Sequence, residues 1–214
     1  KRQKAYSDLD KEYDVEVLLD IGSDTGDVLG IPDYAHRVSV ADEHILMKVL
    51  ASERGAHLRA YPVFSSKTVN GKPLFLHALE GTLGDIEMPT HLERIYDIQS
   101  QDSYTLSGEE LDARIRNLLA LVPRTDEPSK RLGEDFRVDS IRGQWKSLFD
   151  TVHERKFVVL HLKVICASGT YMRSLAGRIG ESLETKALAL SIKRTKIGKF
   201  TSLWRGIGWW TQTY

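Results

Sequence analysis

One cation in this chain stands where basic side chains are disfavoured. Arg173 lies in the segment Cys166–Leu175, CASGTYMRSL, which joins an apolar strand to a helix and places the arginine in the helix's first turn. The exposed N–H groups and the macrodipole make a helix start electropositive, so an arginine there is mildly disfavoured unless it meets an anion. A guanidinium binds carboxylates and phosphates in two-point geometry. We therefore expect Arg173 to bind a specific anion; the alternative is a side chain that points into water.

Two carboxylates, Asp24 and Asp27, lie three residues apart in the polar loop 22–27. Such a pair could hold Mg²⁺ for phosphoryl chemistry, but a calcium loop needs ligands at five or more fixed offsets. Gly, Ser and Asp in this arrangement are typical of a tight turn. We favour the turn, and a small metal-dependent phosphatase is a minor alternative.

Other reactive residue types give weaker signals. Ser65 stands close to Lys67, but serine–lysine enzymes place the lysine three residues along a helix, so we discount a nucleophile here. The seven histidines are scattered and form no HExxH pair. The sequence therefore predicts no metal site and no cofactor.

The composition describes a globular protein with a real core, since 41% of the 214 residues are hydrophobic. No run approaches the roughly 18 apolar residues that cross a bilayer, and the basic start lacks the apolar core of a secretory signal. Cys166 is the only cysteine, so no intrachain disulfide is possible. A cytoplasmic protein without a membrane partner is expected.

The net charge is zero, yet the charges are unevenly distributed along the chain. Residues 156–214 contain 10 Lys and Arg against 2 Asp and Glu, and the rest of the chain is correspondingly acidic. A concentrated basic region attracts a phosphate backbone, because neutralised phosphates release counterions. The alternative is a basic face that contacts only water.

Apolar periodicity predicts the elements that must position these residues. No regular alternation of strands and helices is present, which favours one mixed α/β (α+β) domain, residues 1–214, with a largely antiparallel or mixed sheet flanked by helices. Ser107 and Glu110 fit a capping box, and Asn70-Gly71 is a strong turn signal. We predict strands over 13–21, 94–98 and 157–165, helices over 41–54, 74–79, 107–121, 138–149 and 171–184, an apolar segment 187–192 followed by a basic one 193–196, and a loop over 123–135.

Four blocks in this order resemble the TruB-type tRNA pseudouridine synthases, which convert the T-loop uridine of tRNA (position 55) to pseudouridine. Together they span most of the chain outside residues 32–58 and 99–156. The first and last are specific and the third is weak alone. The blocks are Lys11–Asp14 continuing to Ser23–Asp27, Tyr61–Leu74, Arg94–Ile98, and Val164–Phe200 with its CASGTYMRSL and IKRTKIGKF signatures.

The resemblance implies a pseudouridine synthase-like fold and roles for particular residues. Tyr13, in the K-x-Y motif, would stack on the flipped target base, and Arg173 would pair with the catalytic aspartate. Ile192, where leucine is usual, would pack beside the base. A half-buried strand aromatic and an ordinary core residue are the alternatives for Tyr13 and Ile192. The implied RNA-binding residues are Lys11, Ser65, Lys67, Lys193 and Arg194.

The resemblance also implies a tRNA T-arm as partner, no cofactor or metal, and a monomer. The family's nucleophilic aspartate belongs to a G-T-L-D motif before the K-x-Y block, and no such block precedes Lys11. Residues 81–85, GTLGD, imitate the motif at the wrong place, and we interpret them as a coincidence. Because covalent catalysis needs that carboxylate, we expect an N-terminally incomplete domain, inactive alone.

Two further departures from the family's pattern are present. Thr68 stands where a lysine is common, which puts one contact with the RNA backbone in doubt. No separate RNA-binding domain is evident after Phe200, and the Trp-rich ending could pack on the sheet or on a preceding segment. A non-catalytic RNA-binding module of the same fold remains the alternative to the enzyme.

Overall fold

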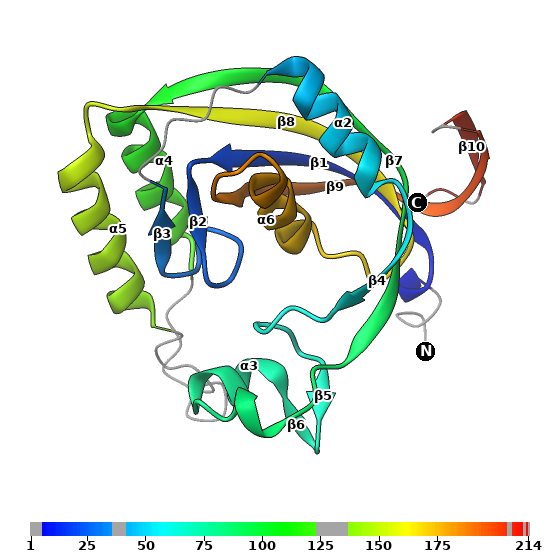
Figure 1. The fold of residues 1–214 in the computed structure, drawn as a ribbon, viewed down its shortest axis with the longest axis horizontal. Helices are drawn as coiled ribbons and strands as arrows, with labels where there is room; N and C mark the ends of the chain where they lie inside the picture. Colours follow the sequence, from blue (N-terminus) through cyan, green and yellow to red (C-terminus); the bar gives the residue numbers. More distant parts are fainter. Residues whose placement is uncertain (1–5, 36–41, 123–136, 205–206, 212, 214) are drawn as a thin grey trace.

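An antiparallel sheet of six strands runs through the molecule in the order β10-β9-β1-β8-β7-β4 (Figure 1). The computed structural model describes residues 6–35, 42–122, 137–204, 207–211 and 213. The prediction of a largely antiparallel sheet flanked by helices is confirmed. The six strands are β1 (Asp10–Leu19), β4 (Gly55–Ala60), β7 (Thr90–Ser107), β8 (Lys156–Cys166), β9 (Ala187–Trp204) and β10 (Ile207–Thr211).

The central strand β1 lies between β8 and β9, and its alternating residues divide between the two faces of the sheet. Val15, Val17 and Leu19 face one side, whereas Leu18 contributes to the apolar cluster on the other. The strand ends at Leu19, earlier than predicted, because Asp20 has a positive φ of 71°. The chain then turns into the short hairpin of β2 (Ile21–Ser23) and β3 (Pro32–Tyr34).

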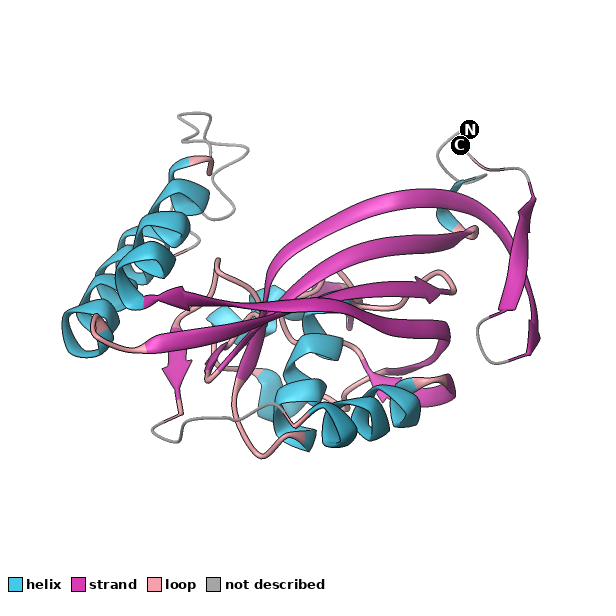
Figure 2. Ribbon diagram, turned by 90° about the horizontal axis from the view of Figure 1, so that it is seen from above, coloured by secondary structure: helices cyan, strands magenta, loops and turns pink. Residues whose placement is uncertain are grey.

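Each face of the sheet is covered by one pair of helices. The helices α2 (Glu43–Glu53) and α6 (Met172–Ser182) pack on the face that carries Val15 and Leu162, which we call the site face. The helices α4 (Gly108–Ala120) and α5 (Val138–Val152) pack on the opposite face, the far face. Figure 2 shows the two groups of helices apart from each other along the sheet.

The predicted helices form, with ends that differ by a few residues. The capping box of α4 is confirmed, because Ser107 accepts from the N–H of Glu110 and the Glu110 carboxylate accepts from the N–H of Ser107. Trp145 of α5 faces inward and is 2% exposed. The predicted loop 123–135 lies outside the described residues.

Between β4 and β7 the chain forms a small separate unit, residues 62–89, which we call the lobe (Figure 1). It contains the hairpin β5 (Thr68–Val69) and β6 (Lys72–Pro73), the helix α3 (Leu74–Leu79) and the 3₁₀ turn η1 (Leu83–Asp85). Asn70 and Gly71 have φ values of 52° and 80°, as a two-residue hairpin turn requires. Buried His77 contacts Thr82 and the carbonyl of Val69.

Two strands are longer than the sequence predicts. β7 continues from the predicted strand 94–98 through a polar stretch to Ser107, because that stretch pairs with β8. β9 continues through the basic residues 193–196, which lie opposite Glu12 and Asp14 of β1. Pairing with a neighbouring strand therefore overrides the local polarity of both segments.

The end of β9 and β10 form an arm that projects from the sheet (Figures 1 and 2). Trp210 contacts Phe200 at 5.2 Å between ring centroids, so this tryptophan packs on the sheet. Trp209 is 50% exposed. Within the described residues, no helix combines the length and the apolar character that crossing a membrane requires.

Candidate active site

Arg173 is one of the first residues of α6, and its guanidinium is held by three groups. Nη1 donates to the carbonyl of Thr25 and Nη2 donates to the carbonyl of Phe64, each at 3.0 Å. Nη1 also lies 3.4 Å from Oδ2 of Asp27, and the two side chains are only 24% and 21% exposed. Arg173 therefore meets a carboxylate of this chain and does not point into water.

The loop after β2 holds Asp27 in place. Oδ1 of Asp27 accepts from the hydroxyl of Thr25 at 2.7 Å and from the N–H of Leu29 at 2.9 Å. The carbonyl of Gly26 accepts from the N–H of Ala189, which attaches the loop to β9. Gly26 has a φ of 78°, and a Cβ there would lie 3.0 Å from the carbonyl oxygen of Arg173. This close approach to α6 explains why glycine stands at that position.

The predicted turn over 22–27 is confirmed, and both of its carboxylates are engaged. Asp24 accepts from the N–H of Ile31 at 2.9 Å and forms an ion pair with Arg137. In the part of the chain that the structure describes, no group of three His, Cys, Asp or Glu side chains is placed to hold a metal ion. The sequence favoured a turn role for Asp27, with Mg²⁺ binding as the alternative, and it did not predict the contact with Arg173 because nothing in it showed that α6 lies beside the loop.

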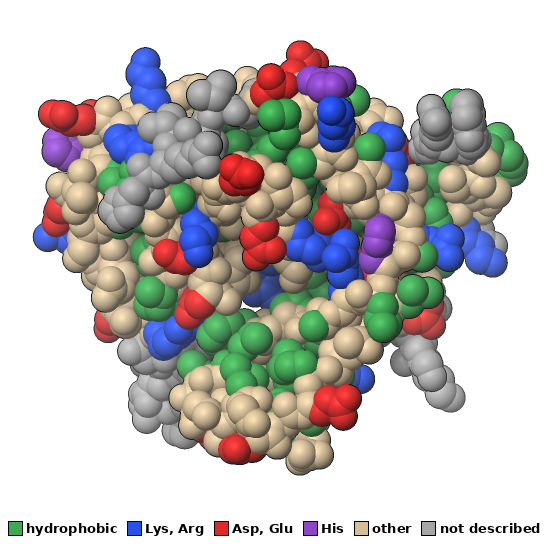
Figure 3. Space-filling view, viewed as in Figure 1, with side chains coloured by type: hydrophobic (Ala, Val, Ile, Leu, Met, Phe, Trp, Pro, Cys, Tyr) green, Lys and Arg blue, Asp and Glu red, His purple; other side chains and the backbone are tan. Residues whose placement is uncertain are grey.

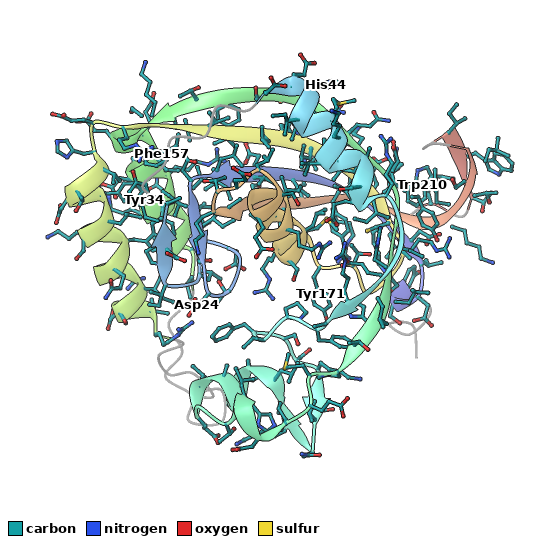
Figure 4. All side chains as sticks on the ribbon, viewed as in Figure 1. Asp24, Tyr34, His44, Phe157, Tyr171 and Trp210 are labelled. Atoms are coloured by element: carbon teal, nitrogen blue, oxygen red, sulfur yellow. The ribbon has the colours of Figure 1, made fainter. Side chains whose placement is uncertain are left out.

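A cleft of about 410 Å³ opens beside Arg173, lined by the loop 23–26, by residues 59–64 and by one side of α6. Arg59 and Arg178 line it together with Arg173. Figure 3 shows a hollow between the body and the lobe with Lys and Arg side chains in its walls. In Figure 4, Asp24 and Tyr171 lie along the edge of the body that faces the lobe. The cleft is thus lined by three arginines and by the carboxylates of Asp24 and Glu181, and it is framed by two parts of the chain.

Tyr13 and Arg194 lie opposite each other on β1 and β9, and their side chains share the site face. The guanidinium carbon of Arg194 is 5.6 Å from the centroid of the Tyr13 ring. Tyr13 is half-buried against the apolar cluster, and this burial raises its pKa. The structure therefore presents a partly covered aromatic ring beside a cation.

Ile192 lies opposite Val15 on the same face and is 42% exposed, which is unusual for a large apolar residue in the middle of a sheet. An ordinary core residue would be buried, so this alternative does not describe Ile192. Lys193 lies on the far face, because successive residues of a strand alternate. The structure thus brings Ile192 and Arg194 together with Tyr13 and places Lys193 elsewhere.

The other predicted RNA-binding residues have different surroundings. Lys11 is 8% exposed and donates to the carbonyl of Ser7 at 2.6 Å, and burial followed by the nearby Arg194 lowers its pKa. Ser65 is 6% exposed at the base of the lobe. Lys67 is exposed, with its ammonium 5.0 Å from the ring centroid of Tyr61. Lys67 is therefore accessible to a ligand, whereas Lys11 and Ser65 are largely covered.

An aromatic cluster that sequence patterns did not predict lies where the lobe joins the body. The rings of Tyr61 and His91 are 4.3 Å apart, and Tyr171 contacts both, at 6.1 Å and 5.7 Å between centroids. His91 also contacts the carbonyl of Gly169 at 3.0 Å.

The GTLGD segment, residues 81–85, ends at Asp85, which is exposed on η1. The groups that contact Arg173, described above, belong to other residues.

The sequence matches the model of a known family, described as the TruB family pseudouridylate synthase (N terminal domain), over residues 1–116. The chain belongs to this family. It is 28% identical over 193 residues to the tRNA pseudouridine synthase B of Azoarcus sp. (strain BH72), covering 90% of this chain and 46% of that protein. The proteins of the same name from Francisella tularensis subsp. tularensis (strain SCHU S4 / Schu 4) and Corynebacterium efficiens are 26% and 29% identical.

These alignments cover 90% and 72% of this chain, and 46% and 54% of the relatives. The chain thus spans about half the length of the curated relatives it matches. Among solved structures, the crystal structure of a Cbf5-Nop10-Gar1 complex aligns with 91% of this chain and 32% of its own chain, at 14% identity and a TM-score of 0.45.

Proposed function

We propose that the protein carrying this TruB-family chain isomerises the T-loop uridine of tRNA to pseudouridine. The observation that supports this most is the placement of Arg173, which lies in the motif that the family uses and lines a cleft beside the start of α6. Family membership supports the reaction type. The site face adds a half-buried aromatic ring and an exposed apolar side chain, Tyr13 and Ile192, as a base requires.

The chemistry assigns these residues distinct tasks. The uridine is flipped out of the RNA and stacks on Tyr13, with Ile192 against its edge. An aspartate carboxylate, oriented by Arg173, bonds to C1′ of the uridine as the bond between C1′ and N1 breaks. The uracil rotates, C1′ bonds to C5 as its bond to the carboxylate breaks, the C5 proton leaves and N1 gains a proton. The product is an isomer of the substrate, so the reaction needs no oxidant or reductant.

The nucleophilic aspartate of this scheme has no matching position among the 214 residues. Asp27 pairs with Arg173, but its Oδ1 is bound by the loop, so it is placed to share the guanidinium rather than to leave the loop. Arg173 has only one carboxylate oxygen at ion-pair distance in the described residues, and its fork geometry accommodates a second carboxylate. Reading the coding sequence upstream of Lys1 tests this: a GTLD-like block there supports the enzyme.

The T-arm of tRNA is the proposed partner, bound by a monomer. Lys67 and Arg194 are exposed cations of the predicted RNA-binding set, and they would contact phosphates. A protein that neutralises phosphates loses affinity as salt rises. Lys193 lies on the far face, so we assign it no contact with the RNA near the target base.

A non-catalytic RNA-binding module is the second candidate. It is favoured by the ion pair between Arg173 and Asp27, because Asp27 compensates the positive charge of Arg173 without a second carboxylate. Such a module would bind the T-arm and leave its uridine unchanged. The two candidates therefore differ in product and not in affinity.

The test uses the protein made from its complete coding sequence and a tRNA transcript labelled with tritium at C5 of uridine. Pseudouridine formation releases the C5 tritium, so we expect about one equivalent per tRNA. A matched transcript with cytidine in place of the T-loop uridine should release none. Binding of the transcript without release would identify the RNA-binding module, and equal release from both transcripts would exclude T-loop specificity.

A further inference from the structure

The site face buries two carboxylates that the proposed reaction does not use. The side chains of Glu53 on α2 and Glu93 on β7 are 7% and 4% exposed, and that of Arg178 between them is 17% exposed. Buried ion pairs are weak evidence for stability, because desolvation offsets much of their attraction. Their hydrogen bonds are directional, however, and fix the geometry of the elements that carry them.

Arg178 joins both carboxylates to α6. Its Nε and Nη2 donate to Oε2 of Glu53 at 3.0 Å and 2.9 Å, and Nη2 donates to Oε2 of Glu93 at 2.9 Å. Oε1 of Glu93 accepts from the backbone N–H of Tyr171, the residue before α6, at 3.0 Å. A rotation of α6, or a shift along its axis, would lengthen these bonds. The cluster therefore fixes both the rotation of α6 and its position along its own axis.

Glu53 also reaches the second element that binds Arg173. Its Oε2 lies 3.4 Å from Nη2 of Arg59, at the end of β4. From Arg59 the chain continues to Phe64, whose carbonyl accepts from Arg173. One carboxylate thus connects the helix that carries Arg173 with the segment that binds its guanidinium.

We propose that Glu53 and Glu93, acting through Arg178, are positioning residues for Arg173. The inference rests on the proposed function for its kinetic test only. Arg173 and Arg178 lie on the same helix, so a displacement of α6 at Arg178 moves the backbone of Arg173 as well. A misplacement of about 1 Å of a reacting group can lower a rate by about 10²-fold.

The kinetic test compares Glu93→Gln and Glu53→Gln in the complete protein. Both variants should lower kcat by about 10- to 100-fold with KM changed by less than about threefold. Glu53→Gln leaves the bonds of Glu93 to Arg178 and Tyr171 intact, so it stays informative where Glu93→Gln does not fold. The matched control is Glu16→Gln, which removes another arginine-bound carboxylate on the far face and should change kcat by less than about threefold.

A double variant separates positioning from general destabilisation. In an Arg173→Lys background, Glu53→Gln should lower kcat by less than a further threefold or so, because the group it positions is already altered. An equal loss of kcat in both backgrounds would overturn the inference. So would a loss in wild type no larger than that of Glu16→Gln.

A measurement without RNA distinguishes failure of this inference from failure of the proposed function. Exchange of the Arg173 guanidinium protons with water, followed by ¹⁵N NMR, should accelerate in Glu53→Gln and stay unchanged in Glu16→Gln. Unchanged exchange in Glu53→Gln would overturn the inference even in an active enzyme. If wild type releases no tritium, the proposed function fails, whereas faster exchange still supports positioning.

Discussion

The site face and the far face of the sheet each bury one apolar cluster beneath two helices, but their polar groups differ in where they lead. On the far face, Trp145 donates to the carbonyl of Val28 at 3.1 Å, and Glu16 is bound by Tyr104 and Arg114. On the site face, Arg173 reaches out of α6 to a loop and to the base of the lobe. Polar groups on the far face form contacts within the fold, whereas those on the site face position the guanidinium of Arg173.

The same contrast changes the interpretation of the charge distribution. The basic C-terminal part of the sequence looked like a surface for RNA, yet four of its cations pair with carboxylates of the acidic part. They are Arg173 with Asp27, Arg178 with Glu53 and Glu93, Lys186 with Asp33, and Lys196 with Glu12. Part of the charge separation along the sequence is therefore compensated inside the fold.

The largest expected effect is on the far face. Trp145→Ala should lower the free energy of unfolding by about 3–5 kcal/mol, because it removes a buried ring that stacks on Phe149 and leaves a cavity. Urea unfolding measures this, with Leu121→Ala, a 77% exposed position, as the control. A loss below about 1 kcal/mol would show that the far face does not carry the stability assigned to it.

Arg173→Ala, on the site face, should mainly lower the reaction rate. The single-turnover rate of pseudouridine formation should fall by about 10²–10³-fold, which corresponds to about 3–4 kcal/mol of lost electrostatic stabilisation. The control is Arg116→Ala, whose side chain is 71% exposed and pairs with Asp112 on the surface. An unimpaired Arg173→Ala protein would remove the proposed role.

Tyr13 sharpens the comparison within the site face. Tyr13→Leu should lower kcat/KM by about 5- to 150-fold, since stacking on an aromatic ring contributes about 1–3 kcal/mol per base. Tyr13→Phe keeps the ring and should stay within about threefold of wild type. If Tyr13→Phe lowers kcat/KM as much as Tyr13→Leu does, the hydroxyl group and not the ring carries the role of Tyr13.

The smallest effect concerns pH and the far face. Burial raises the pKa of Glu16, but hydrogen bonds from Tyr104 and Arg114 outweigh burial and leave it below the ordinary value of 4.5. A depressed folded-state pKa contributes stability above the unfolded-state value and loses it as the pH falls through the folded one. Below about pH 4.5 the free energy of unfolding should therefore decline less steeply in Glu16→Gln than in wild type. If the free energy of unfolding declines equally steeply with falling pH in both proteins, this prediction is contradicted.

Local signals in the sequence predicted a large part of the fold. The capping box of α4 and the Asn70-Gly71 turn depend on residues within four positions of one another, and both form as predicted. The lengths of β7 and β9 were missed, because they depend on pairing with distant strands. Local pattern thus identified the elements, while long-range pairing decided where two of the strands end.

The candidate site divides in the same way. The CASGTYMRSL segment indicated that Arg173 needs an anion, since that need follows from its place in a helix. The partners Asp27 and Phe64 lie over a hundred residues earlier and could not be read from spacing. Likewise, Lys11 donates to the carbonyl of Ser7 in the segment before β1, a contact that the K-x-Y motif itself does not predict.

The most direct test of the account measures the single-turnover rate and the unfolding curve of Arg173→Ala and Trp145→Ala side by side, in the complete protein. The account predicts a crossed result: the Arg173 variant loses its rate and loses less stability than the Trp145 variant. The Trp145 variant loses stability and, at a temperature where it is folded, keeps its rate. Rates that fall together in both variants, or an Arg173→Ala protein as fast as wild type, would contradict the account.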